Sequence, residues 1–263
     1  LIVGGGYHGK STLLSALQMG VYDHVAGDGR EFVLADETAV KLRAEEGRSI
    51  RNTDISMFIN DLPNGKNTKS FSTPDASGST SQAAGVLEGI EAGSRLFLID
   101  EDTSATNFMV RDDFMQQVIS REKEPITPFL ERAGDLYEKA GVSTILVAGS
   151  SGAFFYIADH IIQMDCYKPV EITERVKALC KEHQAPRTQA PGFAVPGFAE
   201  AYAAGKSKNA KVKTFGRDTF SIDRETVDLR YVEQMADFEQ TSALAYLTRY
   251  ALEQLADGRK TRS

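Results

Sequence analysis

The feature that most constrains this chain is a glycine-rich run close to its first residue. Residues 4–11 read Gly-Gly-Gly-Tyr-His-Gly-Lys-Ser and follow directly on the apolar residues 1–3. A glycine, four further residues and then Gly-Lys-Ser is the pattern of a phosphate-binding loop that joins a strand to a helix. Three leucines at helical spacing follow within residues 13–17. The start of the chain therefore predicts a strand, a phosphate-binding loop and a helix, in that order.

The residue types in this loop suit the phosphate chain of a nucleotide. Glycines let backbone N–H groups turn toward phosphate oxygens, and the following helix presents its positive N-terminal end. Lys10 is expected to reach the outer phosphates, and the Ser11 hydroxyl is expected to ligate Mg²⁺. We interpret Tyr7 and His8 as spacers within the loop. The predicted nucleotide-binding residues are Gly4, Gly5, Gly6, Tyr7, His8, Gly9, Lys10, Ser11 and Thr12.

Further apolar runs extend this pattern along the chain. Residues 95–100 and 144–148 have the composition of strands buried on both faces. The amphipathic segments 112–123 and 128–140 lie between them and predict helices. Alternating strands and helices predict an α/β fold, here a P-loop NTPase with a mostly parallel sheet flanked by helices.

An acidic pair ends the first of these runs. Asp100 and Glu101 stand where a buried strand is expected to end. In a P-loop protein, an aspartate at that point can hold Mg²⁺ and a neighbouring carboxylate can orient the attacking water. We therefore predict Ser11 and Asp100 as the Mg²⁺ site and Glu101 as the catalytic base.

Charge and composition narrow the classes of function. The chain has 30 basic and 37 acidic residues, a net charge of −7, so no broad basic surface holds nucleic acid by charge alone. It contains no apolar run of about 18 residues, which excludes a membrane-spanning helix from the prediction. Cys166 and Cys180 are too few for a disulfide scaffold and lack metal-ligand spacing. A soluble protein of the reducing cytoplasm is expected.

The remainder of the chain is less regular. Residues 60–80 predict an exposed loop, residues 173–181 a helix, residues 185–213 a flexible linker and residues 231–255 a final helix. We expect an ATP-binding domain over residues 1–170 and a C-terminal helical extension over residues 171–263. Because the chain opens within an apolar run and without Met, we interpret the first domain as N-terminally truncated.

Three later segments resemble those of ABC ATPases, in order and in spacing. Residues 100–107, Asp-Glu-Asp-Thr-Ser-Ala-Thr-Asn, resemble the Walker B and D-loop run of that family. Residues 76–82, Ala-Ser-Gly-Ser-Thr-Ser-Gln, are similar to its signature, and Ser77 stands 23 residues before Asp100, as in the family. Residues 158–165 are similar to the strand that follows its switch loop.

The resemblance is closer to one branch, the predicted ATPases of the ABC class, and covers residues 1 to about 180. The runs that carry it are residues 27–31, 54–63, 76–84, 100–109 and 124–129. It implies a soluble ATPase that is not a transporter and that binds ATP and Mg²⁺. It also implies an ATP-dependent head-to-tail homodimer, in which the signature residues Ser77, Gly78, Ser79 and Thr80 of one copy cap the nucleotide of the other.

Some positions depart from the family pattern. The family's switch histidine is expected just after residue 148, where this chain has Gly-Ser-Ser, so Ser150 and Ser151 are the switch candidates. His160 comes about ten residues too late and is interpreted as a structural residue of the next strand. Asn107 replaces the D-loop aspartate, and Asn52 or Asp54 lies near the expected Q-loop glutamine. The missing histidine therefore predicts slow turnover of ATP.

The alternative function is a slow or inactive nucleotide-gated switch that binds RNA or a protein partner. A basic strip, Lys206, Lys208, Lys211, Lys213 and Arg217, and a terminal cluster, Arg259, Lys260 and Arg262, are its candidate contacts. Without interleaved aromatic residues, solvation is the simpler interpretation of such a strip. A P-loop kinase is disfavoured because the signature and D-loop runs would then have no purpose.

Overall fold

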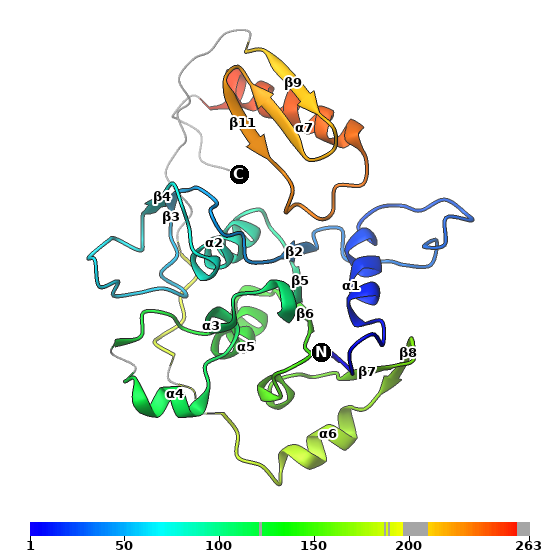
Figure 1. Cartoon of the computed structure of the whole chain (residues 1–263), viewed down its shortest axis with the longest axis vertical. Coiled ribbons are helices and arrows are strands. Elements are labelled where there is room, and N and C mark those ends of the chain that lie inside the picture. The colour runs from blue at the N-terminus through cyan, green and yellow to red at the C-terminus, as the bar shows by residue number, and fades with distance from the viewer. Residues whose placement is uncertain (121–122, 187, 189, 197–209, 257–263) are drawn as a thin grey trace. The chain divides into compact units, whose positions relative to one another are not determined.

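The computed structural model describes residues 1–120, 123–186, 188, 190–196 and 210–256 (Figure 1). The chain divides into two compact units, Leu1–Gly197 and Phe198–Ser263, which are described separately. In the described part of the chain, no helix combines the length and the apolar character needed to cross a bilayer.

The first unit is built on a six-stranded sheet with strand order β2-β5-β6-β1-β7-β8. The strands are β1 (Ile2–Val3), β2 (Val40–Leu42), β5 (Leu96–Asp100), β6 (Ser143–Val147), β7 (Ile162–Asp165) and β8 (Lys168–Glu171). Neighbours from β2 to β7 pair in parallel, and β8 pairs antiparallel with β7. The predicted mostly parallel α/β sheet is confirmed.

Helices cover both faces of this sheet. The helices are α1 (Lys10–Met19), α2 (Gly78–Glu91), α3 (Thr106–Met109), α4 (Asp113–Val118), α5 (Phe129–Ala140) and α6 (Thr173–Cys180). Leu98 of β5 packs with Leu14 of α1 in one core cluster, whereas Phe97 belongs to the cluster that contains residues of α2, α3 and α5. Because successive strand residues point to opposite faces, α1 and α2 lie on opposite sides of β5, as Figure 1 shows.

The larger core joins three of the segments that carried the family resemblance. Phe58, Phe108 and Phe129 are buried, and their ring centroids lie 4.9–6.4 Å apart. The Thr127 N–H donates to the Phe58 carbonyl over 2.7 Å, which ties the outer two segments together through the backbone. These runs therefore serve packing on the face of the sheet away from α1.

Part of the predicted loop over residues 60–80 is a strand. β4 (Phe71–Thr73) pairs antiparallel with β3 (Ile50–Thr53) in a separate two-stranded sheet. Phe71 is buried at this pairing, which anchors a segment otherwise rich in serine and threonine. A strand of only three residues carries too little periodicity to be predicted, so the assignment of the whole segment to a loop was wrong.

The second unit contains an antiparallel sheet that was not predicted. Its elements are β9 (Val212–Phe215), β10 (Thr219–Ile222), β11 (Glu225–Asp228), α7 (Phe238–Tyr250) and a π-helical turn over Ala251–Leu255. Phe220 of β10 and Ala245 of α7 are buried in one core cluster. The expected final helix begins at Phe238 instead of residue 231, because Asp237 caps it in a capping box with Gln240.

Candidate nucleotide site

The glycine-rich loop leaves β1 in a conformation that favours glycine. Gly4 and Gly9 have φ values of +145° and +93°, and Tyr7 has a φ of +63°. A Cβ atom on Gly4 would lie 2.5 Å from the Met164 carbonyl oxygen of the neighbouring strand β7, so a side chain does not fit there. The loop ends at Gly9, which is the N-cap of α1 and, as a glycine, has no side chain to cap that helix. The N–H groups at a helix N-terminus that the N-cap side chain does not engage are a suitable site for an anion.

The side chain of Lys10 folds back over the base of this loop. Its Nζ donates to the carbonyls of Gly4 and Gly5, each over 2.8 Å. A Cβ atom on Gly149, after β6, would lie 4.0 Å from Lys10 Cε. The Lys10 ammonium is thus held beside two loops, while the predicted neighbours Ser11 and Thr12 are exposed in the first turn of α1.

Asp100 ends β5 at the same edge of the sheet. Strand register places Asp100 opposite Val147, and Val147 opposite Ile2, two residues before the loop. The Asp100 carboxylate is buried and accepts a hydrogen bond from the Asp102 N–H over 3.2 Å. Carboxylate and hydroxyl oxygens are the donors that Mg²⁺ prefers, so Asp100 and Ser11 fit the ion by chemistry.

Glu101 is bound by the loop that follows β6. Its carboxylate accepts from the Gly149 N–H at 2.7 Å, the Ser150 N–H at 2.9 Å and the Ser150 hydroxyl at 2.7 Å. Partial burial raises the pKa of Glu101, but the hydrogen bonds from Ser150, Gly149 and Ser151 outweigh this and hold the pKa below its ordinary value. Glu101 is therefore a stable carboxylate at neutral pH.

The structure thus brings Lys10, Glu101 and Ser150 together, as the sequence interpretation requires, and adds the backbone of Gly149. The sequence analysis did not predict a role for Gly149, although the positions of the predicted strands could have indicated one. Glu101 and Gly149 follow the ends of two strands predicted from apolar runs, and adjacent parallel strands present their ends at one edge. His160 does not join this group; it is exposed just before β7, so its placement within a strand was wrong.

The signature-like residues are held by the segment that follows β5. Ser77 is the exposed N-cap of α2, Ser79 is buried, and Ser79 Oγ donates to Asn107 Oδ1 over 2.9 Å. The buried Gln82 side chain donates to Ser104 Oγ and accepts from the Ala105 N–H, each over 2.9 Å. The signature and D-loop runs are therefore one connected unit within the chain.

The two candidates for the Q-loop residue lie elsewhere. Asn52, within β3, accepts a hydrogen bond from Ser70 Oγ. Asp54 accepts one from the Ser56 N–H over 2.9 Å. Asp54 thus stabilises a local turn, and Asn52 ties β3 to the residue just before β4. Within the described residues, neither hydrogen bond reaches the glycine-rich loop.

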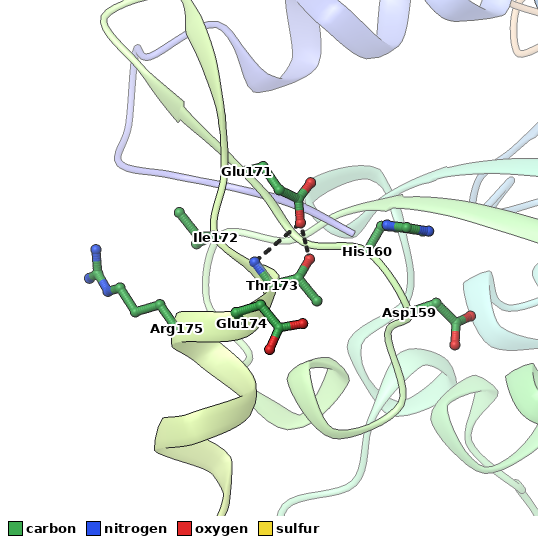
Figure 2. Close-up of a pocket in the computed structure, with 7 residues that line it drawn as sticks. All are labelled: Asp159, His160, Glu171, Ile172, Thr173, Glu174 and Arg175. Carbon is green, nitrogen blue, oxygen red and sulfur yellow. Dashed lines mark hydrogen bonds between the residues drawn. The ribbon is translucent and has the colours of Figure 1, made fainter.

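A hollow of about 700 Å³ lies apart from the site residues. It is lined by Asp159, His160 and residues 171–175, and Figure 2 shows Glu171 accepting two hydrogen bonds from Thr173. The Thr173 hydroxyl and N–H hold the pKa of Glu171 below its ordinary value, against a smaller opposing effect of burial. Glu171 is thus already engaged by its own chain, and none of the predicted nucleotide-site residues lines this hollow.

Comparisons with known proteins agree with this geometry. The P-loop domain of the ABC ATPase family matches residues 1–198, and the MRB1590 C-terminal domain matches residues 211–263. An uncharacterized protein of Methanocaldococcus jannaschii is 33% identical over 170 residues, which cover 64% of this chain. The matched stretch spans 37% of the length of that relative.

Proposed function

Because the chain belongs to the ABC ATPase family by its P-loop domain, we propose that it binds ATP with Mg²⁺ and hydrolyses it in a head-to-tail dimer. The observation that carries this proposal is the convergence of Lys10, Glu101 and the Gly149–Ser150 backbone at one edge of the sheet. This arrangement supplies a cation for the phosphates and a carboxylate for water, which are the two parts that phosphoryl transfer to water requires.

Glu101 has the capacity to orient water as it stands. The Gly149 and Ser150 N–H groups both donate to Oε2 of Glu101, and the Ser150 hydroxyl donates to Oε1. Each carboxylate oxygen has two lone pairs, so Oε1 can also accept a hydrogen bond from the attacking water and direct the oxygen lone pair of that water at the γ-phosphorus. The lowered pKa of Glu101 makes it a weak base, so its contribution is mainly the orientation of that water.

The loop residues bind the phosphates. A triphosphate draws the Lys10 ammonium away from the carbonyls of Gly4 and Gly5, and the uncapped first turn of α1 donates N–H groups to phosphate oxygens. Ser11 and Asp100 would hold Mg²⁺, which neutralises phosphate charge when bound. Each of these groups acts on charge that grows on the phosphate oxygens during transfer.

The strand order supports a dimeric site. Gly78 lies against Ala44 and Ala105, which follow β2 and β5, whereas the glycine-rich loop follows β1. β2, which leads to Ala44, is three strands away from β1, roughly 14 Å at a strand spacing of about 4.8 Å. The signature of one chain is therefore displaced from its own phosphate loop, and a second copy supplies it in the proposed dimer.

The test combines Glu101→Gln with Ser77→Arg. The glutamine keeps one oxygen for the Gly149 and Ser150 N–H groups, and the Ser150 hydroxyl can accept from its amide. Glu101→Gln is expected to bind Mg-ATP, to lose hydrolysis by about 100-fold or more, and to dimerise on ATP in light scattering. Ser77→Arg in the same protein is expected to abolish the dimer while ATP binding remains.

Two results would contradict the proposal. Full hydrolysis by Glu101→Gln would show that Glu101 takes no part in the reaction. A Glu101→Gln protein that stays monomeric at saturating Mg-ATP, whether or not Ser77 is replaced, would show that ATP does not drive dimer formation. Ser143→Arg, an exposed serine at the start of β6, is the matched control for added bulk and charge.

A nucleotide-gated RNA switch is the second candidate, and the second unit favours it. Lys213 and Phe215 are exposed on β9, and their register partners Ser221 and Thr219 share their face of the sheet. Phe215 stands between Lys213 and Arg217, so the interpretation that the basic strip lacks aromatic residues was wrong. Lys206, Lys208, Arg259, Lys260 and Arg262 lie outside the described residues.

This alternative has its own test. Lys213→Ala and Phe215→Ala are expected to lower the affinity for single-stranded RNA, and the lysine variant also to reduce the salt slope by about one. Arg249→Ala, which removes the same charge from α7, is the control. Equal RNA affinity and salt slope in all three variants and in the parent protein would exclude the sheet as an RNA surface.

A further inference from the structure

Three metal-ligating side chains meet beside the phosphate loop, although they are far apart in the chain. His8 belongs to the glycine-rich loop, and Asp165 and Cys166 stand where β7 turns into β8. One ring nitrogen of His8, one carboxylate oxygen of Asp165 and the Cys166 sulfur all lie within 4.8 Å of one another. Neither the predicted phosphate site nor the predicted Mg²⁺ site uses Asp165 or Cys166.

The turn is docked on the loop by backbone hydrogen bonds. The Tyr167 N–H donates to the His8 carbonyl over 3.2 Å, and the Cys166 N–H donates to His8 Nδ1 over 3.0 Å. Tyr167 also packs on Gly9, where a Cβ atom would come within 2.7 Å of its ring. The backbone of Cys166 is therefore held beside the imidazole by the folded structure, which keeps its thiol within reach of His8.

The orientation of the imidazole identifies the nitrogen that faces the β7–β8 turn. The Nε2 edge of His8 faces Gly5, where a Cβ atom would lie 3.4 Å from Nε2. Nδ1 faces the turn, 3.4 Å from Asp165 Oδ1 and within reach of Cys166. Nδ1 is thus on the same side as the carboxylate and the thiol, and a metal ion there would replace the Cys166 N–H as its partner.

We propose that His8, Asp165 and Cys166 form a binding site for a divalent transition metal of the zinc class. Bonds of about 2.0–2.3 Å to zinc place ligand atoms roughly 3.3–3.8 Å apart, so a small closure of this cluster suffices. One imidazole, one thiolate and one carboxylate suit zinc or cobalt and not magnesium, which takes oxygen ligands. Three protein ligands at an exposed position leave the fourth coordination place to water.

The site is separate in chemistry from the Mg²⁺ site predicted at Ser11 and Asp100, and it does not depend on the proposed hydrolysis. Its metal would bridge the phosphate loop and the β7–β8 turn. The number and spacing of the cysteines did not predict this metal site. His8 and Cys166 are 158 positions apart, and neither stands in a spaced metal-binding motif.

Cobalt(II) titration of the whole chain without nucleotide tests the proposal. A thiolate-to-cobalt charge-transfer absorption is expected to saturate at one equivalent and to disappear in Cys166→Ser. His8→Ala and Asp165→Ala are expected to weaken zinc binding by about tenfold or more in competition with a chromophoric chelator. Cys180→Ser and His160→Ala, which remove the same ligand types elsewhere, are expected to bind like the parent.

Three outcomes would overturn the site. The first is no stoichiometric cobalt absorption in the folded parent protein, whose fold is checked by circular dichroism. The second is an absorption that survives Cys166→Ser and disappears in Cys180→Ser. The third is displacement of cobalt by millimolar Mg²⁺, which would place the metal on oxygen ligands.

Discussion

Residues 4–11 and residues 77–80 are both short runs of glycine and small polar residues that lead into a helix, yet they are held in different ways. The first run is shaped by its backbone, with positive φ at Gly4, Tyr7 and Gly9, and Tyr7 is 99% exposed. The second run is held by its side chains, through the Ser77 cap and the Ser79 bond to Asn107. In the dimer proposed above, the first run would receive phosphate on its backbone, and the second run would present itself to the partner while its own side chains hold it in place.

The largest effect is expected from replacing Lys10, which tests whether the first run binds phosphate. Lys10→Ala is expected to lower ATP affinity by about 100-fold, near 2.7 kcal/mol, because the ammonium pairs with phosphate charge. Its fold is expected to persist, since the hydrogen bonds of the Lys10 ammonium to the described residues go to two carbonyls of its own loop. Isothermal titration measures the affinity and circular dichroism the fold. Lys168→Ala, an exposed lysine on β8, is the control, and unchanged affinity in Lys10→Ala would refute the phosphate loop.

A second change tests whether backbone shape holds the first run. Gly4→Ala is expected to destabilise the protein by about 2 kcal/mol, because its Cβ would meet a backbone oxygen 2.5 Å away. Gly6→Ala, in the same run, meets nothing within 4 Å and is expected to change stability by less than about 0.5 kcal/mol. Urea unfolding of both variants measures the difference, and equal stabilities would show that the loop relaxes freely.

Replacing Gln82 tests whether side-chain hydrogen bonds hold the second run. Gln82→Ala leaves the Ala105 N–H without its acceptor inside the unit, at an expected cost of about 1–2 kcal/mol in urea unfolding. Ser77→Ala removes only an exposed cap and is expected to cost about 0.5–1 kcal/mol. A larger loss for Ser77→Ala than for Gln82→Ala would show that the cap, and not the buried amide, holds the signature.

The smallest expected effect is the loss of the Glu101 hydrogen bonds at acidic pH. The pKa of Glu101 in the folded chain is below the ordinary value of about 4.5, so its bonds to the loop after β6 stabilise the fold above that pH. This contribution is lost as the pH falls through the lowered pKa. The Gly149 and Ser150 amide resonances are therefore expected to titrate with a midpoint below about 4.5, and Glu101→Gln is expected to remove that titration. A midpoint above 4.5 would mean that burial, and not hydrogen bonding, dominates.

Much of the first unit could be predicted because its signals are local. The phosphate loop, the apolar runs of β5 and β6 and the amphipathic helix α5 each carry their pattern within about a dozen residues. Asp100, Glu101 and Ser150 could be assigned to one place once the strands were assigned to one parallel sheet. The detailed bonds of Glu101 to the Gly149 and Ser150 backbone required the register of β5 and β6.

The missed features depend on contacts across long stretches of chain. β9, β10 and β11 are four residues long each, and β9 begins within residues 185–213, whose Pro, Gly and Lys content indicated a linker. Their sheet forms because Phe220 and Ile222 share a core with α7. The meeting of His8 with Cys166 likewise requires β1 to pair with β7, which no local pattern specifies.

The alignment of β5, β6 and β1 has a consequence for how this site can change over evolutionary time. The three loops of the site begin at the ends of three neighbouring strands whose ladder fixes their bases at Asp100, Val147 and Ile2. The chain beyond each base can therefore be exchanged as a separate module while the other two keep their places. A Gly-Ser-Ser sequence after β6 can thus stand where a histidine stands in the wider family, without displacing either the phosphate loop or Glu101.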